Sequence, residues 1–218
     1  MRRFAAVPPP LRLSLCLPLC LPLALAALLL PACAELRTPP PRTELPLDLV
    51  PAAQDPFRSA VRLAARDFAD QAAGLNGRPA ETARAAARLE FLAQAIATDP
   101  RYSDFPPGMV MALRGAVAEV RQAIGLSETA LPDQAIGALA AAARAIEAGG
   151  GSGGAFPETL FPAGPERTRQ RLAEPGPLPE AAIATGRLEE AVAAMDREGG
   201  WGRRPGGLSP LGAMSTSP

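Results

Sequence analysis

Apolar residues recur every three or four positions in four stretches between residues 55 and 148. Such spacing places the apolar side chains on one face of a helix. Each stretch begins at a proline, a residue that is favoured at the first position of a helix. The pattern predicts helices near 56–73, 79–98, 107–124 and 132–149. Their apolar faces consist of Phe57, Val61, Ala64, Phe68 and Ala72; Ala85, Leu89, Leu92 and Ile96; Val110, Leu113, Val117, Val120 and Ile124; and Ile136, Leu139, Ala143 and Ile146.

Each of these amphipathic helices needs a partner for its apolar face, and antiparallel packing of neighbours supplies one with short loops. We therefore predict an all-α fold, a four-helix bundle of two αα-hairpins over residues 55–148. A further amphipathic helix is expected at 179–198, where Ala184, Leu188 and Val192 share a face. This helix either docks as a fifth helix or stays free for a partner.

Proline and glycine divide the rest of the chain. Residues 35–54 read as a Pro-rich tether, because proline runs favour an extended conformation. Residues 149–178 form a Gly/Pro-rich linker that contains one short helical stretch near 166–173. Residues 199–218 are expected to be a disordered tail. The predicted bundle is thus flanked by disordered tethers.

Residues 1–34 have the order of a secretion signal. Arg2, Arg3 and Arg12 precede an apolar run over 13–30, and small residues follow at Ala32-Cys33-Ala34. Cleavage after Ala34 would release a mature chain that starts at Glu35. Retention of the apolar run as a membrane anchor is the alternative, although Pro18 and Pro22 interrupt it.

Leu30-Pro31-Ala32-Cys33 resembles the lipobox of bacterial lipoproteins, with Pro31 as a departure from the pattern. The resemblance implies cleavage before Cys33 and attachment of lipid to that cysteine. The two exits predict different places for the protein: free in the periplasm, or anchored to an envelope membrane through Cys33. Either exit predicts export.

The residue types in the chain narrow the chemistry. There is no histidine, which excludes Ser-His-Asp triads and histidine metal sites. All three cysteines precede residue 34, so the mature body has no disulfide framework and no cysteine zinc site. From residue 34 onward 19 arginines face 22 acidic residues, a net charge of −3, which argues against a nucleic-acid partner. We predict no cofactor, no metal and no catalytic residues.

Three patterns that could suggest a catalytic or metal site have simpler readings. The run 150–154 matches G-x-S-x-G, but its composition is that of a flexible linker and the chain has no histidine to complete a triad. Asp67 and Asp70 are read as a solvated helix face, with Arg66 placed to pair with Asp70. Glu189 and Glu190 are adjacent and point in different directions, so they suggest no joint role.

Aromatic residues mark one candidate recognition edge. Tyr102 and Phe105 lie in the loop between the second and third predicted helices, and loops between rigid helices often carry binding residues. The alternative is that both rings cap the end of the core. Trp201 is expected in the mobile tail, where it either anchors a partner or is an ordinary exposed aromatic residue.

The leading functional hypothesis is an exported envelope protein whose helical bundle is a non-enzymatic interaction or scaffold module, with an envelope protein as its partner. A periplasmic bundle that binds a small ligand in a cavity between its helices is the second hypothesis. An enzyme that uses carboxylate, arginine or serine chemistry is the third, and it requires several such groups to converge in one cleft.

Overall fold

The computed structural model describes residues 43–50, 55–149, 154–199 and 201. All of them belong to the second of the two units into which the chain divides, Arg42–Pro218. The leader, with the candidate lipid-attachment residue Cys33, lies outside the described residues, as do residues 150–153 of the G-x-S-x-G pattern.

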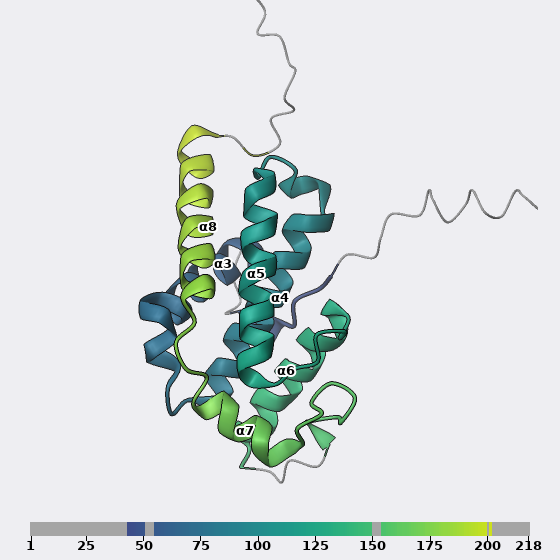
Figure 1. Cartoon of the computed structure of the whole chain (residues 1–218). Helices are drawn as coiled ribbons and strands as arrows, with labels where there is room; N and C mark the ends of the chain where they lie inside the picture. The colour runs from purple at the N-terminus through teal and green to yellow at the C-terminus, as the bar shows by residue number, and fades with distance from the viewer. Residues whose placement is uncertain (1–42, 51–54, 150–153, 200, 202–218) are drawn as a thin grey trace, which may run out of the picture. The chain divides into compact units, whose positions relative to one another are not determined.

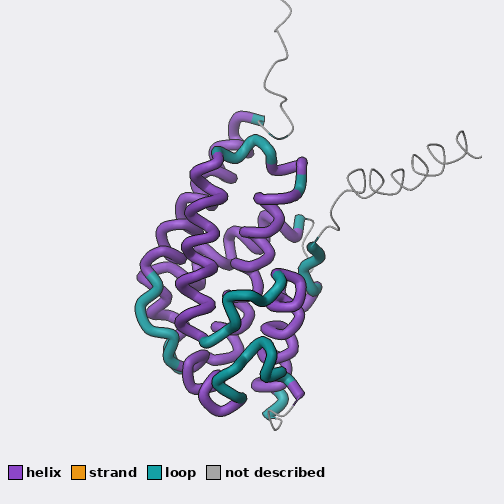
Figure 2. Tube along the Cα trace, turned by 45° about the vertical axis from the view of Figure 1, so that its right-hand side comes forward, coloured by secondary structure: helices purple, strands orange, loops and turns teal. Residues whose placement is uncertain are grey.

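Over the described residues the regular structure is all helical, without a strand (Figures 1 and 2). Every α-helix in the described part of the chain begins with a proline, whose fixed φ suits the first helical position and whose missing N–H costs no hydrogen bond there. The predicted all-α fold is confirmed. The α-helices among these residues are α3 (Pro56–Phe68), α4 (Pro79–Thr98), α5 (Pro107–Ile124), α6 (Pro132–Glu147), α7 (Pro165–Ala173) and α8 (Pro179–Glu198).

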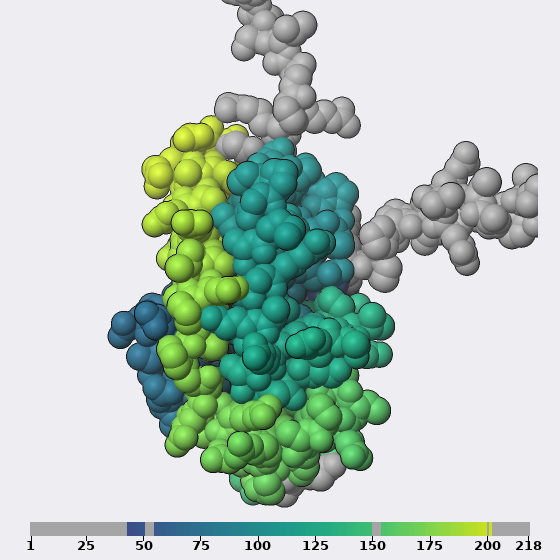
Figure 3. All heavy atoms as spheres, in the orientation of Figure 1, coloured from purple at the N-terminus to yellow at the C-terminus, as the bar shows by residue number. Residues whose placement is uncertain are grey.

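Four of the helices pack in a closed ring, in which α3 contacts α4, α4 contacts α5, α5 contacts α8, and α8 contacts α3. Helix α6 packs along α4, and α7 lies across one end of the ring against α4 and α5 (Figure 1). The C-terminal helix has therefore docked, and its side chains meet those of α5 along the face seen in Figure 3. The helical bundle with a fifth, C-terminal helix is confirmed.

The first helix ends earlier than its apolar spacing predicts. It stops at Phe68, and a short 3₁₀ segment, η2 (Ala69–Leu75), follows. Within η2, Asp70, Gln71 and Ala72 have φ angles of 52°, 54° and 66°, in the left-handed region. Such residues cost about 1–2 kcal/mol each when they are not glycine. Packing holds them in place, because Ala72 is fully buried and the Gln71 carbonyl accepts a hydrogen bond from the Leu178 N–H at 3.0 Å.

Helix α4 is buried on nearly all sides and carries two charged residues into the core. Arg88 pairs with Asp67 of α3 at 2.5 Å, and both side chains are about 6% exposed. Glu90 accepts two hydrogen bonds from Arg121 of α5, at 2.5 and 2.8 Å. The reading of Asp67 as a solvated residue is therefore wrong, because its partner Arg88 reaches it from the next helix.

The placement of Arg66 and Asp70 also differs from the sequence reading. Arg66 pairs with Asp67 at 2.8 Å rather than with Asp70. Asp70 has left the helix and stands exposed in the left-handed turn, so the expected spacing of four residues along one helix does not apply.

Part of the predicted tether packs against the helices. A single 3₁₀ turn, η1 (Leu47–Leu49), leads into Val50, and both Leu49 and Val50 are buried. The Leu49 carbonyl accepts a hydrogen bond from Arg88 Nε at 2.7 Å, and Asp48 pairs with Arg144 of α6 at 2.6 Å.

None of the described helices combines the length and the hydropathy needed to cross a membrane.

Candidate functional site

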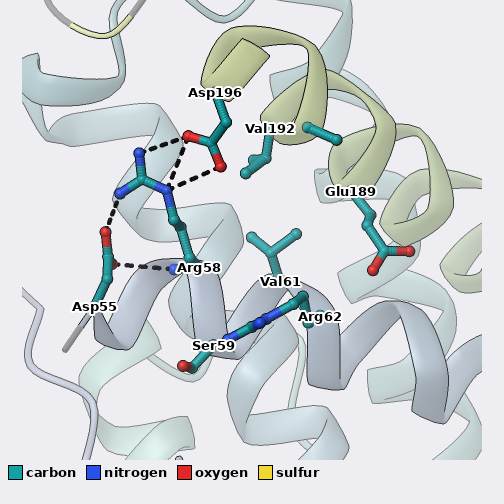
Figure 4. Close-up of a pocket in the computed structure, with 9 residues that line it drawn as sticks. Asp55, Arg58, Ser59, Val61, Arg62, Glu189, Val192 and Asp196 are labelled. Atoms are coloured by element: carbon teal, nitrogen blue, oxygen red, sulfur yellow. Dashed lines mark hydrogen bonds and ion pairs between the residues drawn. The ribbon is translucent and has the colours of Figure 1, made fainter. Parts of the chain in front are cut away.

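A surface cleft of about 510 Å³ lies between α3 and α8. Its volume is within the range of about 300–1,000 Å³ that is typical of small-molecule sites. We call it the α3–α8 cleft. It is lined by Asp55, Arg58, Ser59, Val61 and Arg62 from α3 and its cap, and by Glu189, Val192, Ala193 and Asp196 from α8 (Figure 4).

One end of the cleft is closed by a network of three charged residues. Asp55 is the N-cap of α3 and accepts a hydrogen bond from the backbone N–H of Arg58 at 3.1 Å. The Arg58 guanidinium pairs with the Asp55 carboxylate and reaches Asp196 near the end of α8, with Nη2 2.7 Å from Oδ1 (Figure 4). Arg58 therefore joins the first turn of α3 to the last turn of α8.

The same carboxylate of Asp196 also holds Trp201. The indole Nε1 donates to Asp196 Oδ1 at 2.5 Å, and the Arg58 guanidinium carbon lies 4.4 Å from the centre of the indole. Hydrogen bonds from Arg58, and secondarily from Trp201, hold the pKa of Asp196 below its usual value. Asp196 is thus a fixed negative charge near neutral pH, and it is a poor proton donor.

Behind this network the four rings of Phe57, Tyr102, Phe105 and Trp201 form an aromatic cluster. Phe57 and Tyr102 stack with centroids 4.0 Å apart, and Trp201 meets the other three edge-on at 6.1–6.3 Å. Such edge-on contacts are favoured by the charge distribution of aromatic rings. Burial raises the pKa of the Tyr102 hydroxyl.

The candidate recognition edge is thus part of this cluster, and the rings of Tyr102 and Phe105 are only 8% and 6% exposed. Trp201, expected in a mobile tail, instead contacts the cluster. A smaller hollow of about 300 Å³ adjoins it, lined by Asp55, Phe57, Arg58, Arg101, Tyr102 and Trp201. Asp55 and Arg58 line both this hollow and the α3–α8 cleft.

The rest of the cleft combines an apolar floor with opposite charges. Val61 and Val192 are buried and point toward each other between the two helices (Figure 4). Arg62 and Glu189 are exposed and lie on the α3 and α8 sides of the cleft. The arrangement suits recognition of a ligand by shape and charge.

Glu189 is the lining residue that the sequence reading set aside. Its adjacency to Glu190 does not reveal that α8 packs on α3. The pairing of Arg58 with Asp196 spans 138 residues, so no local pattern announces it. The Asp55-Pro56 capping signal at the start of α3 is the one local signal that falls at this site.

The α3–α8 cleft does not lie in the alanine-rich seam, where the second functional hypothesis expected a cavity. The alanine-rich faces of α4 are closely filled, and Ala83, Ala85 and Ala87 are fully buried. The cleft lies instead between α3 and α8.

Among the described residues no group of three or more histidine, cysteine, aspartate or glutamate side chains could hold a metal ion.

Comparison of the chain with protein-family models, with curated protein sequences and with solved structures finds no match.

Proposed function

We propose that this protein is exported to the bacterial envelope and acts there as a non-enzymatic binding module, with the α3–α8 cleft as its binding surface. The observation that carries the binding role is the cleft itself. Its walls come from two helices that the Arg58–Asp196 pair fastens together, so the surface exists before anything binds to it. A preorganised surface loses less entropy on binding than a mobile one.

The leader supports export. Positive residues, an apolar run and a small-residue exit occur in that order over residues 1–34. Lipid attachment at Cys33 would anchor the module to a membrane, and cleavage after Ala34 would release it into the periplasm. The remaining tether, residues 35–42, precedes the segment that packs on α4 and α6.

Fractionation of the native host with N-terminal mass spectrometry tests the export step. We expect the processed chain in the envelope fraction, beginning either with acylated Cys33 or with Glu35. Recovery of the unprocessed chain, with Met1, from the cytosol would contradict export.

Photo-crosslinking in living cells tests the binding surface. A crosslinking amino acid replaces Arg62 at the cleft, and a matched variant carries it in place of Gln134, which is exposed on α6 and does not line the cleft. We expect an adduct with an envelope component from position 62 only. Equal adducts from both positions would count against the cleft, and no adduct from position 62 would count against a protein partner there.

A small ligand is the second candidate occupant of the cleft. The volume of about 510 Å³ and the apolar floor of Val61 and Val192 favour it. A thermal-shift screen of the intact protein against envelope metabolites distinguishes a small ligand from a protein partner. A small ligand raises the melting temperature and gives no protein adduct.

A further inference from the structure

Two opposite charges in the α3–α8 cleft are available to a ligand. Within the described part of the chain, neither Arg62 nor Glu189 takes part in an ion pair or a side-chain hydrogen bond. The other charges of the cleft differ, because Asp55, Arg58 and Asp196 satisfy one another. A bound molecule could therefore pair with Arg62 and Glu189 without breaking any existing contact.

The two charges stand on different walls. Arg62 belongs to α3 and Glu189 to α8, and their charged atoms are more than 4.0 Å apart, since the pair is not an ion pair. The apolar side chains of Val61, Val192 and Ala193 line the same cleft. The cleft thus offers a cation, an anion and an apolar surface to one ligand.

We propose that the α3–α8 cleft binds a small zwitterion, an amino acid or short peptide with a free amino group, a free carboxylate and an apolar side chain. The carboxylate pairs with Arg62, whose guanidinium offers two parallel N–H donors. The ammonium group pairs with Glu189, and the apolar side chain packs against Ala193 beside the buried Val61 and Val192. The inference rests on the proposed binding role of the cleft and adds the chemistry of what it holds.

Charge balance favours a zwitterion over a simple ion. A ligand with only a carboxylate would pair with Arg62 and bring a second negative charge toward Glu189. A ligand with only an ammonium group would pair with Glu189 and bring a second positive charge toward Arg62. Like charges brought close together oppose binding, whereas a zwitterion meets both walls at once.

Isothermal titration of the full processed chain tests the proposal, with the tripeptide Ala-Leu-Ala as the probe. Three blocked forms serve as comparisons: N-acetylated, C-amidated and blocked at both ends. Free leucine is a further probe that distinguishes an amino acid from a peptide as the occupant. We expect the free tripeptide or leucine to bind, each single block to weaken binding up to about fivefold, and the double block to weaken it further.

Charge variants of the protein locate the site. Arg62→Gln and Glu189→Gln should each weaken binding to a similar extent, while Arg187→Gln and Glu190→Gln should not change it. Arg187 and Glu190 are exposed on the same helix as Glu189 but do not line the cleft, so they control for a general charge effect. The double charge reversal Arg62→Glu/Glu189→Arg should restore the affinity that each single variant loses, because the ligand can bind in the opposite orientation.

The proposal is overturned if the doubly blocked peptide binds as well as the free one, if no zwitterion binds, or if the control variants weaken binding as much as the cleft variants. Circular dichroism of each variant verifies folding, and all four positions are exposed. Failure here alongside an adduct from position 62 would reject the zwitterion and retain the cleft. If no zwitterion binds and position 62 also gives no adduct, the cleft itself is rejected as a binding surface.

Discussion

Trp201 donates its indole N–H to Asp196 at 2.5 Å, and this bond fixes the residue after the C-terminal helix to the helix itself. The same carboxylate binds Arg58 of α3. Asp196 therefore connects the start of α3, the end of α8 and the aromatic cluster.

The aromatic cluster should contribute measurably to stability through Trp201. Trp201→Ala removes three edge-on ring contacts and the stacking of Arg58, and we expect it to lower the free energy of unfolding by about 1–2 kcal/mol. Trp201→Phe keeps a ring but loses the N–H donor, so its loss should be smaller. Urea denaturation followed by circular dichroism measures both, and an unchanged midpoint for Trp201→Ala would argue against the contact.

Acid should weaken the contacts that Asp196 makes with Arg58 and Trp201, because protonation removes its negative charge. The pKa of Asp196 is lowered in the folded state, so its contribution to stability is present above the unfolded value of about 4 and is lost as pH falls through the lower folded-state pKa. Asp196→Asn should remove that part of the pH dependence, whereas Asp133→Asn, on the exposed side of α6, should keep it. Thermal melts between pH 2 and pH 7 provide the comparison.

The fluorescence of Trp201, the only tryptophan in the chain, should follow the same acid transition. Emission should move to longer wavelength as the indole leaves the ring cluster for water. If the emission spectrum stays constant while the protein loses stability below pH 4, protonation of Asp196 does not release Trp201 from the aromatic cluster.

The buried pair of Glu90 and Arg121 should be far more sensitive than the surface pairs. Glu90→Leu leaves the Arg121 guanidinium buried without its counter-charge, and we expect a loss of about 3–5 kcal/mol in the free energy of unfolding. Asp48→Ala breaks an exposed ion pair with Arg144 and should cost less than about 1 kcal/mol. If chemical denaturation gives similar losses of unfolding free energy for Glu90→Leu and Asp48→Ala, the burial of the Glu90–Arg121 pair is contradicted.

The double variant Glu90→Leu/Arg121→Met should recover only part of that loss. Arg121 also donates hydrogen bonds to the carbonyl oxygens of Glu128 and Ala130, at 2.9 and 3.0 Å. Removing both charges leaves these two acceptors without that donor. Full recovery would indicate that the loop carbonyls are satisfied by water instead.

The left-handed turn should be relieved by glycine. Gln71→Gly places a residue without a Cβ at φ 54°, so we expect about 1 kcal/mol of added stability. The matched substitution Arg114→Gly, at an exposed position inside α5, should instead cost about 1 kcal/mol. Thermal melts that move in the same direction for both variants would argue against a left-handed turn at Gln71.

Local signals predict much of this fold. The apolar faces of the helices and the proline at each helix start depend on residues within a few positions of one another, and the structure matches them over most of their length. The end of the first helix is the exception, because Ala72 is buried in the left-handed turn just as it would be in a continued helix. Periodicity alone does not separate the two conformations.

The candidate site depends on contacts that local patterns do not contain. Asp67 looks like a surface residue until α4 brings Arg88 beside it, and Glu189 gains meaning only when α8 packs on α3. Trp201 sits among glycines that suggest a tail, yet it contacts three rings that lie far from it in sequence. Each of these placements follows from tertiary packing.

Hydrogen exchange of the intact protein, read by mass spectrometry, tests most directly whether α8 is a fixed wall of the cleft. We predict that amides of α8 around Ala184, Leu188 and Val192 open with free energies close to those of α3, because the two helices share one buried interface. Exchange of α8 at nearly unprotected rates, while α3 and α4 remain protected, would show an undocked helix and would remove the cleft.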